Sequence, residues 1–333
     1  MNSILRIPAA VLSVAVAGMF LSSGCTKEEN PSRDGAPLNF SAGILEVTEV
    51  KAAAETSAND FYVKGYDSGD QWFPSLPATN PEHVVLTGGG GTYDSYKWKK
   101  GRTKTFFAYS NNLPAGVSAA ITKDGATLTY TAIPTGAAAQ TDVMLGLYSG
   151  NGNNEGKAQL SFSHPLAQVA FIRGALTSVS AISSISIEGV YSTGTATLGS
   201  GGSVSWSGTG GSTDVSQTVS GSLPSAEGQI GIPFMLIPQT MTVKNVTVKV
   251  ACTISGVAKT LKTTFDSGVF AQGKRTTVKV NFKGADKVTF EVGVTAWGSN
   301  NGGSADAEAV GLLSFDGVAL DGWQDVNSGE LDL

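Results

Sequence analysis

Cys25 is the residue whose position in this sequence indicates a defined reaction. It directly follows Gly24, at the end of an apolar segment that runs from Val11 to Leu21, with Arg6 ahead of it. The segment is shorter than the roughly 20 residues that span a bilayer, so it is typical of a signal peptide. A small residue before a cysteine at this place is the lipoprotein pattern, in which diacylglycerol is transferred to the thiol and signal peptidase II cuts before it. We expect residues 1–24 to be removed and Cys25 to carry acyl chains such as palmitate.

The lipoprotein pattern is incomplete at one position. Ser22 stands three places before Cys25, where leucine is usual, and Leu21 lies one place further back. The alternative is an ordinary secretory peptide cut nearby, which would leave Cys25 as a free thiol. Lipidation would hold the chain firmly at a membrane, because each buried methylene group contributes about 0.8 kcal/mol.

The histidines and cysteines offer little for catalysis or metal binding. The chain has two histidines, His83 and His164, and neither has a second histidine or cysteine at metal-ligand spacing. Cys252 is the one cysteine besides Cys25, so no cysteine pair could bind zinc and no disulfide framework is expected once Cys25 is acylated. No Gly-x-Ser-x-Gly motif stands between a strand and a helix. We expect no enzymatic activity, no cofactor and no bound metal, and structural roles for both histidines.

Two short motifs resemble ligand loops only in part. Residues 88–91 are four glycines, but neither a helical pattern nor a Lys-Ser/Thr pair follows them, so a loop is favoured over a phosphate site. Residues 67–70 (Asp-Ser-Gly-Asp) begin like a calcium loop but lack the later glutamate that would complete one.

A group of aromatic residues could bind sugars by stacking. Packing in the core and in turns is the favoured alternative for these rings, which are Trp72, Phe73, Tyr93, Tyr96 and Trp98.

The charge of the chain excludes some partners. The formal net charge is −5, and the loss of Arg6 with the signal peptide makes it −6. A mildly acidic surface argues against nucleic acid as a partner and against a polybasic membrane patch.

The elements that must position these residues are β-strands. Short runs rich in Val, Ile, Thr, Phe and Tyr alternate with turn residues, among them 42 glycines. Val246, Val248 and Val250 recur at period two with Lys249 between them, as in a half-buried antiparallel strand. Residues 200–216, rich in Gly, Ser and Thr, are predicted to form a loop. The sequence predicts an all-β fold of β-sandwiches.

Loose segments divide the chain into five parts. The run at residues 150–156 (GNGNNEG) is the strongest internal break, and residues 305–333 are acidic and contain no Lys or Arg. We predict a signal peptide at 1–24, a tether at 25–37, an N-terminal β-sandwich domain at 38–152, a C-terminal β-sandwich domain at 153–300 and an acidic tail at 301–333.

Several segments together resemble the fimbrillin family of the Bacteroidales, whose members build type V pili. The resemblance rests on the order and spacing of short motifs at 38–43 (LNFSAG), 61–63 (FYV), 96–98 (YKW), 106–109 (FFAY), 142–144 (DVM), 160–169 (LSFSHPLAQV), 235–239 (MLIPQ), 273–275 (GKR) and 292–297 (VGVTAW). Residues 26–29 (TKEE) similarly resemble the acidic signal that directs Bacteroidales lipoproteins to the outer face of the outer membrane. The resemblance implies two tandem β-sandwich domains of transthyretin-like topology, with His164 as a structural residue.

The resemblance also implies assembly by donor-strand exchange. In the family, a trypsin-like protease removes the first strand, and a strand from the C-terminal region of the neighbouring subunit fills the groove. Here the removable strand would be Leu38 to Val50, with cleavage between Lys51 and Ala52. Arg33 precedes the strand, so a cut there would free the chain from lipid without opening the groove.

The acidic tail is the donor that the resemblance suggests. The alternative is an acidic disordered extension, because Gly311, Gly317 and Gly322 weaken the tail as a strand. The candidate residues for filling the groove are Leu312, Leu313, Phe315, Val318 and Leu320.

These features together predict a fimbrial subunit at the cell surface. It would be anchored to the outer membrane through Cys25, join other fimbrial subunits head to tail as shaft, tip or anchor, and support adhesion to a host or bacterial surface glycan or protein. The alternative is a surface glycan-binding lipoprotein of a polysaccharide-uptake system, which would use the aromatics near Trp72 and Trp98.

Overall fold

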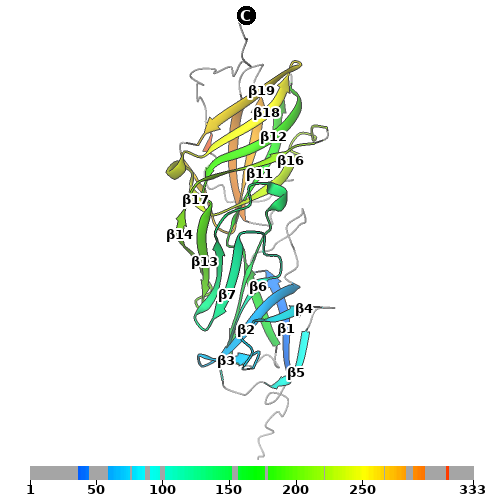
Figure 1. Cartoon of the computed structure of the whole chain (residues 1–333). Helices are drawn as coiled ribbons and strands as arrows, with labels where there is room; N and C mark the ends of the chain where they lie inside the picture. The colour runs from blue at the N-terminus through cyan, green and yellow to red at the C-terminus, as the bar shows by residue number, and fades with distance from the viewer. Residues whose placement is uncertain are drawn as a thin grey trace, which may run out of the picture.

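A computed structural model shows that the chain is built almost entirely of strands (Figure 1). It describes residues 37–44, 59–75, 77–86, 91–97, 102–151, 157–176, 179–220, 222–265, 267–282, 288–296 and 313–314. In these ranges the helical segments are the short η1 (Ala137–Ala139) and η2 (Met241–Lys244), and no helix is long and apolar enough to cross a membrane. The predicted all-β fold class is confirmed. Gly24, Cys25, Lys51 and Ala52 lie outside the described residues.

Two sheets form the half of the molecule that contains the first strand (Figure 1). Within the described ranges, one has eight strands in the order β3-β2-β6-β9-β10-β1-β5, with β4 also paired to β2, and the other has the order β14-β13-β8-β7. The eight-stranded sheet consists of β1 (Pro37–Ile44), β2 (Asp60–Asp67), β3 (Asp70–Phe73), β4 (Glu82–Val85), β5 (Gly91–Lys97), β6 (Lys104–Ser110), β9 (Leu145–Gly150) and β10 (Lys157–Ser163). The second sheet consists of β7 (Val117–Thr122), β8 (Gly125–Tyr130), β13 (Thr193–Gly199) and β14 (Val204–Gly210).

The other half contains the remaining strands that the structure describes. They form sheets in the orders β16-β11-β21-β22-β23, β15-β12-β18-β19 and β17-β20. Their bounds are β11 (Ala167–Leu176), β12 (Val179–Val190), β15 (Thr213–Thr218), β16 (Gln229–Leu236), β17 (Gln239–Thr240), β18 (Thr247–Ile254), β19 (Val257–Thr264), β20 (Val269–Phe270), β21 (Lys274–Phe282), β22 (Val288–Ala296) and β23 (Leu313–Ser314).

Strand β18 shows why the local sequence forms these sheets. Its buried residues alternate with half-buried ones, and Val248 and Val250 are fully buried, as their period-two spacing predicts. Lys249 points to the other face, where its amine pairs with Glu188 of β12. The alternation therefore covers the core on one side and keeps the charge near solvent on the other.

The strand pairing changes two of the sequence-based expectations. The Gly/Asn-rich run at residues 150–156 joins β9 to β10, which pair with each other in one sheet, so the sheets do not separate at the boundary predicted between residues 152 and 153. Instead the chain passes to the five-stranded sheet after Ser163. Residues 200–216 are not one loop: they contain β14 and part of β15, and β14 pairs with β13, which pairs with β8 of the first half.

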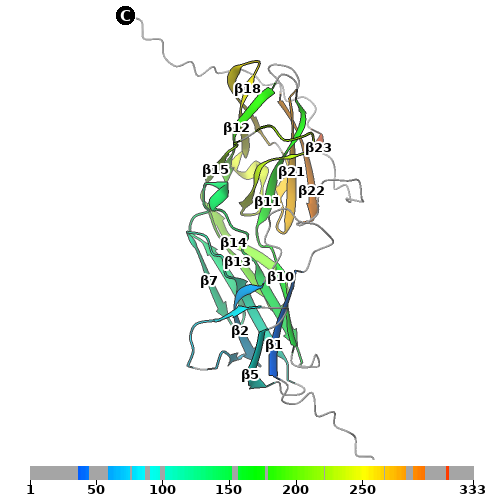
Figure 2. The same ribbon diagram turned by 90° about the vertical axis from the view of Figure 1, so that its right-hand side faces the viewer.

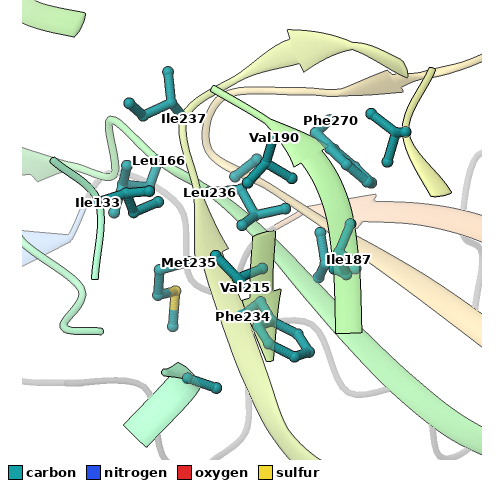
Figure 3. Packing of buried hydrophobic residues seen from close by; sticks show 14 of the residues in the cluster. Ile133, Leu166, Ile187, Val190, Val215, Phe234, Met235, Leu236, Ile237 and Phe270 are labelled. Carbon is teal, nitrogen blue, oxygen red and sulfur yellow. The ribbon is translucent and has the colours of Figure 1, made fainter. Parts of the chain in front are cut away.

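Two apolar clusters form the core. The larger one extends from the packing of β6 on β8 through the five-stranded and four-stranded sheets of the second half, and Figure 3 shows part of it around Leu236. The smaller one lies within the eight-stranded sheet and contains residues of β1, β2, β3, β6 and β10. The two halves are also joined by polar contacts, since Trp206 Nε1 donates to Pro165 O at 2.9 Å and Met235 N donates to Gln140 Oε1 at 2.7 Å.

His164 occupies a structural position between the halves. Its side chain is buried, and Nδ1 lies 3.0 Å and 2.8 Å from the two carboxylate oxygens of buried Asp142. The histidine follows β10 and precedes β11, so this pair ties the end of the first sheet to the connection before β9.

A buried lysine, Lys104, lies at the start of β6 in the eight-stranded sheet. Lys104 is 1% exposed, pairs with the carboxylate of Asp67, and lies with Nζ 4.1 Å from the centre of the Trp72 ring. Arg102 Nε lies 3.0 Å from the same carboxylate. Burial alone would raise the pKa of Asp67, but its hydrogen bond with Lys104 and the charges of Lys104 and Arg102 leave it below its ordinary value of 3.8.

Replacing Asp67 should therefore cost stability in a pH-dependent way. We expect Asp67→Asn to lower the free energy of unfolding by roughly 3 kcal/mol at neutral pH, because it leaves Lys104 buried without its carboxylate. Since the pKa of Asp67 is depressed in the folded chain, its contribution is complete above pH 3.8 and is lost as the pH falls through the folded value. Urea titrations from neutral to strongly acidic pH should show the difference between variant and wild type shrinking.

The exposed Asp70, in the same turn, supplies the control. Asp70→Asn should leave the unfolding midpoint almost unchanged at every pH. A difference between Asp67→Asn and wild type that stays constant into acid would contradict this account of Asp67.

Candidate functional site

The first strand, β1, is the feature of the structure that could be exchanged between molecules. Although it comes first in the chain, it lies inside the eight-stranded sheet, parallel to β10 and antiparallel to β5 (Figure 2). The parallel pairing extends from Asn39 opposite Lys157 to Ile44 opposite Phe162. The chain from β1 to β2 passes through residues 45–58, which lie outside the described part and contain Lys51 and Ala52. A cut in that segment would separate β1 from the rest without interrupting any other described strand.

The side chains of β1 alternate between the core and the surface. Leu38 and Phe40 are fully buried, Asn39 and Ser41 are half-buried, and Ala42 packs against the smaller cluster. This alternation is what a strand with one core-facing side requires. Leu38 and Phe40 are therefore the residues that anchor β1.

Phe40 lies in a cage of aromatic rings. Its ring centre is 5.3 Å from those of Phe73 and Phe106, 5.7 Å from that of Tyr93 and 6.2 Å from that of Phe61, all in edge-to-face arrangements. Each such pair contributes about 0.5–1.5 kcal/mol beyond the area it buries.

The cage also shows how the sheet is shaped. Phe61, Phe73 and Phe106 come from β2, β3 and β6, which do not pair with β1. Contacts between strands so far apart in the order require the eight-stranded sheet to curl around this cluster. Burial raises the pKa of Tyr93 in β5 to about 12, and the nearby Glu82 and Tyr96 contribute to the rise.

The aromatic residues proposed for sugar stacking contribute to this packing. Phe73 is fully buried, and Trp72 meets Tyr96 edge-on with ring centres 5.6 Å apart. The Tyr96 hydroxyl accepts a hydrogen bond from the backbone N–H of Ser75 at 2.8 Å. These rings therefore have the packing role predicted for them, while Trp98 lies outside the described residues.

The other candidate ligand residues have structural partners. His83 Nε2 lies 2.6 Å from Asp60 Oδ1, and its ring stacks on Tyr62 at 4.8 Å. In the Asp67–Asp70 turn, the Asp67 carboxylate is held by Lys104 and Arg102. Among the described residues, no group of three or more His, Cys, Asp or Glu side chains is arranged to hold a metal ion.

Cys252, the one cysteine within the described ranges, is buried. Cys252 is 2% exposed, and burial raises the pKa of its thiol to about 11. It is therefore a core residue and is not activated as a nucleophile.

The second feature of interest is the edge of the five-stranded sheet, in the half opposite β1 (Figure 2). There β23 pairs antiparallel with β22, with Val292 opposite Leu313 and Glu291 opposite Ser314. Of the predicted donor residues, Leu313 lies in this short strand. Leu312, Phe315, Val318 and Leu320 lie outside the described part of the chain.

Residues 52–297 match the sequence profile of the family described as fimbrillin-like. The chain belongs to this family. The fold also resembles two solved structures from the genus Bacteroides. One is a fimbrial protein from Bacteroides vulgatus (14% identity, TM-score 0.53, 78% of this chain and 99% of that chain covered). The other is a protein from Bacteroides ovatus assigned to cell adhesion (19% identity, TM-score 0.52, 78% and 97% covered). No curated protein matches the chain.

The fimbrillin-like match leaves out both ends of the chain. It starts at Ala52, immediately after Lys51, and stops at Trp297, immediately after β22. Strand β1 and residues 298–333 therefore both lie outside the part of the chain that matches the family.

Truncation of Phe40 tests how much the sheet depends on β1. We expect Phe40→Ala to lower the free energy of unfolding by about 3–5 kcal/mol, because it removes a fully buried ring from a packed cage. Ser41→Ala, one position along the same strand, should change it by less than about 1 kcal/mol. Chemical denaturation of the purified chain measures both, and similar midpoints for the two variants would show that Phe40 does not anchor the sheet.

Proposed function

We propose that this chain is a structural subunit of a type V fimbria that assembles by donor-strand exchange at β1 and supports adhesion. The observation that carries the proposal is the placement of β1: it fills the inside of a sheet, yet a single cut between Lys51 and Ala52 would separate it from the family-matched part of the chain. Family membership supports the role of fimbrial subunit, and the strand arrangement supports the mode of assembly.

The physics of the exchange follows from what β1 covers. Its departure would leave the backbone groups of β10 and β5 without their partners and would expose the cage around Phe40. Unpaired backbone groups next to open side-chain pockets bind an extended strand by β-augmentation. A donor strand from another subunit would restore both the ladder and the buried contacts.

The position of the donor decides the shape of the assembly. Strand β22, which precedes the tail, and β23, which lies in the tail, are in the half opposite β1 (Figure 2). A tail that leaves one subunit at this half and fills the groove of the next makes a heterologous contact. Repeated contacts of this kind form an open filament, with one subunit following another head to tail.

Cleavage after Lys51 should start this assembly. A trypsin-like protease should cut the purified chain between Lys51 and Ala52 and leave the tail intact, because residues 288–333 contain no Lys or Arg. We expect the product to form a ladder of oligomers on an unheated gel as donor strands displace the cut β1. Lys51→Gln should remain largely monomeric under the same treatment, because the cut is removed while every β1 contact is kept.

The N-terminal sequence of the ladder bands completes this experiment. Oligomers whose subunits begin at Ala52 agree with the proposal. Protease-treated wild type that stays monomeric, or a Lys51→Gln variant that forms the same ladder at the same rate, would contradict it.

We further propose that Cys25 anchors the precursor to the outer face of the outer membrane. Cells supplied with labelled palmitate should label the wild-type chain, and Cys25→Ser should abolish the label and move the chain from the membrane fraction to the soluble fraction. Cys252→Ala should keep both the label and the membrane location, because Cys252 is buried in the core. A Cys25→Ser chain that remains labelled and membrane-bound would exclude Cys25 as the acylated residue.

A further inference from the structure

We infer that residues 313–317 of a neighbouring subunit replace residues 38–42 in a single register. In this register Leu313 takes the place of Leu38, Phe315 that of Phe40 and Gly317 that of Ala42. The inserted segment runs parallel to β10, as β1 does. This inference rests on the proposed strand exchange and names the part of the tail that carries it.

The groove sets three requirements on any strand that fills it. One position must supply an apolar side chain where Leu38 is fully buried, beside its register partner Tyr93. Two residues later an aromatic ring must fill the cage around Phe40. Two residues after that, a small residue must fit where Ala42 packs against the cluster, opposite Leu160 of β10.

The tail contains one window that meets all three requirements. Residues 313–317 read Leu-Ser-Phe-Asp-Gly, and residues 38–42 read Leu-Asn-Phe-Ser-Ala. The leucine, the phenylalanine and the small residue recur at identical spacing, and the residues between them are polar in both segments. Polar residues suit these positions, since Asn39 and Ser41 are only half-buried in β1.

The other registers of the tail fail either at the aromatic cage or at the position of Leu38. The frame that begins at Leu312 would place Ser314 in the cage, and the frame that begins at Val318 would place Leu320 there. Trp323 is the other aromatic residue of the tail, but its frame would place the charged Asp321 at the position of Leu38. Burial of an unpaired carboxylate in that apolar pocket is costly. Of the five donor candidates, Leu313 and Phe315 therefore enter the pockets and Leu312 does not.

The same register implies competition within the subunit. Leu313 and Ser314 form β23 against β22 of their own chain, so they cannot lie in a neighbour's groove at the same time. Within the described residues, β23 pairs with β22 at two positions, whereas β1 pairs with β10 at six. Exchange into an open groove would give the donor the positions along β10 that β1 occupies, and β23 would hold Leu313 and Ser314 until a groove becomes available.

Cysteine pairs test the register directly. In β1, Ser41 lies opposite Gln159 of β10, and Asp316 occupies the position of Ser41 in the inferred register. In a full-length chain with Cys25→Ser and Cys252→Ala, we expect Asp316→Cys together with Gln159→Cys to give disulfide-linked oligomers after protease activation and mild oxidation. The matched pairs are Gln159→Cys with Ser314→Cys and Gln159→Cys with Val318→Cys, which lie two positions away on either side and should give far less.

The outcomes separate this inference from the proposed function. If the parent chain with no added cysteine forms no oligomers after cleavage, strand exchange itself fails. If oligomers form but the cross-link appears at position 314 or 318, or at none of the three, strand exchange stands and the register is wrong.

Alanine substitutions give an independent measure of the same register. Phe315→Ala should slow the formation of oligomers roughly tenfold or more, as expected for the loss of a central aromatic anchor. Leu312→Ala, three residues earlier in the same tail, should assemble at the wild-type rate. Equal slowing by the two substitutions would overturn the register.

Discussion

The contact on which the rest of the structure depends is the insertion of the Phe40 ring among Phe61, Phe73, Tyr93 and Phe106. These rings come from β2, β3, β5 and β6, so a single side chain of β1 meets both ends of the strand order. The eight-stranded sheet curls around this ring and encloses an apolar cluster of its own. The stability of this half of the molecule and the strand exchange that we propose therefore depend on the same few contacts.

This shared origin constrains how the subunit could assemble. A strand that supplies both a ladder partner and the centre of a core cannot leave an empty groove for long, because the exposed rings and backbone groups favour any strand that restores them. The replacement must then repeat the spacing of Leu38 and Phe40. In the exchange that we propose, a tail segment with that spacing would supply the contact between subunits.

The local pattern of the sequence predicted the strands more successfully than their pairing. The alternation of Val248 and Val250 is visible within a few residues and was found as a buried face. The Gly/Asn-rich run at 150–156 has the same composition whether it joins two domains or two strands of one sheet, and here it joins β9 and β10. Nor does any local signal show that β1 pairs with β10, since parallel pairing between distant segments is set by the whole sheet. The cage around Phe40 could not be predicted either: Phe73 and Tyr93 belong to the aromatic group considered for stacking, but Phe61 and Phe106 do not, and only the curled sheet brings the four rings together.

The central claim is that β1 is a replaceable part of the fold. It is tested most directly by the intact mass and N-terminal sequence of subunits in filaments sheared from the cell surface. The account predicts subunits that begin at Ala52 and have lost residues 38–51, with the groove filled by the tail of a neighbour. Filaments whose subunits still carry residues 38–51 would contradict it.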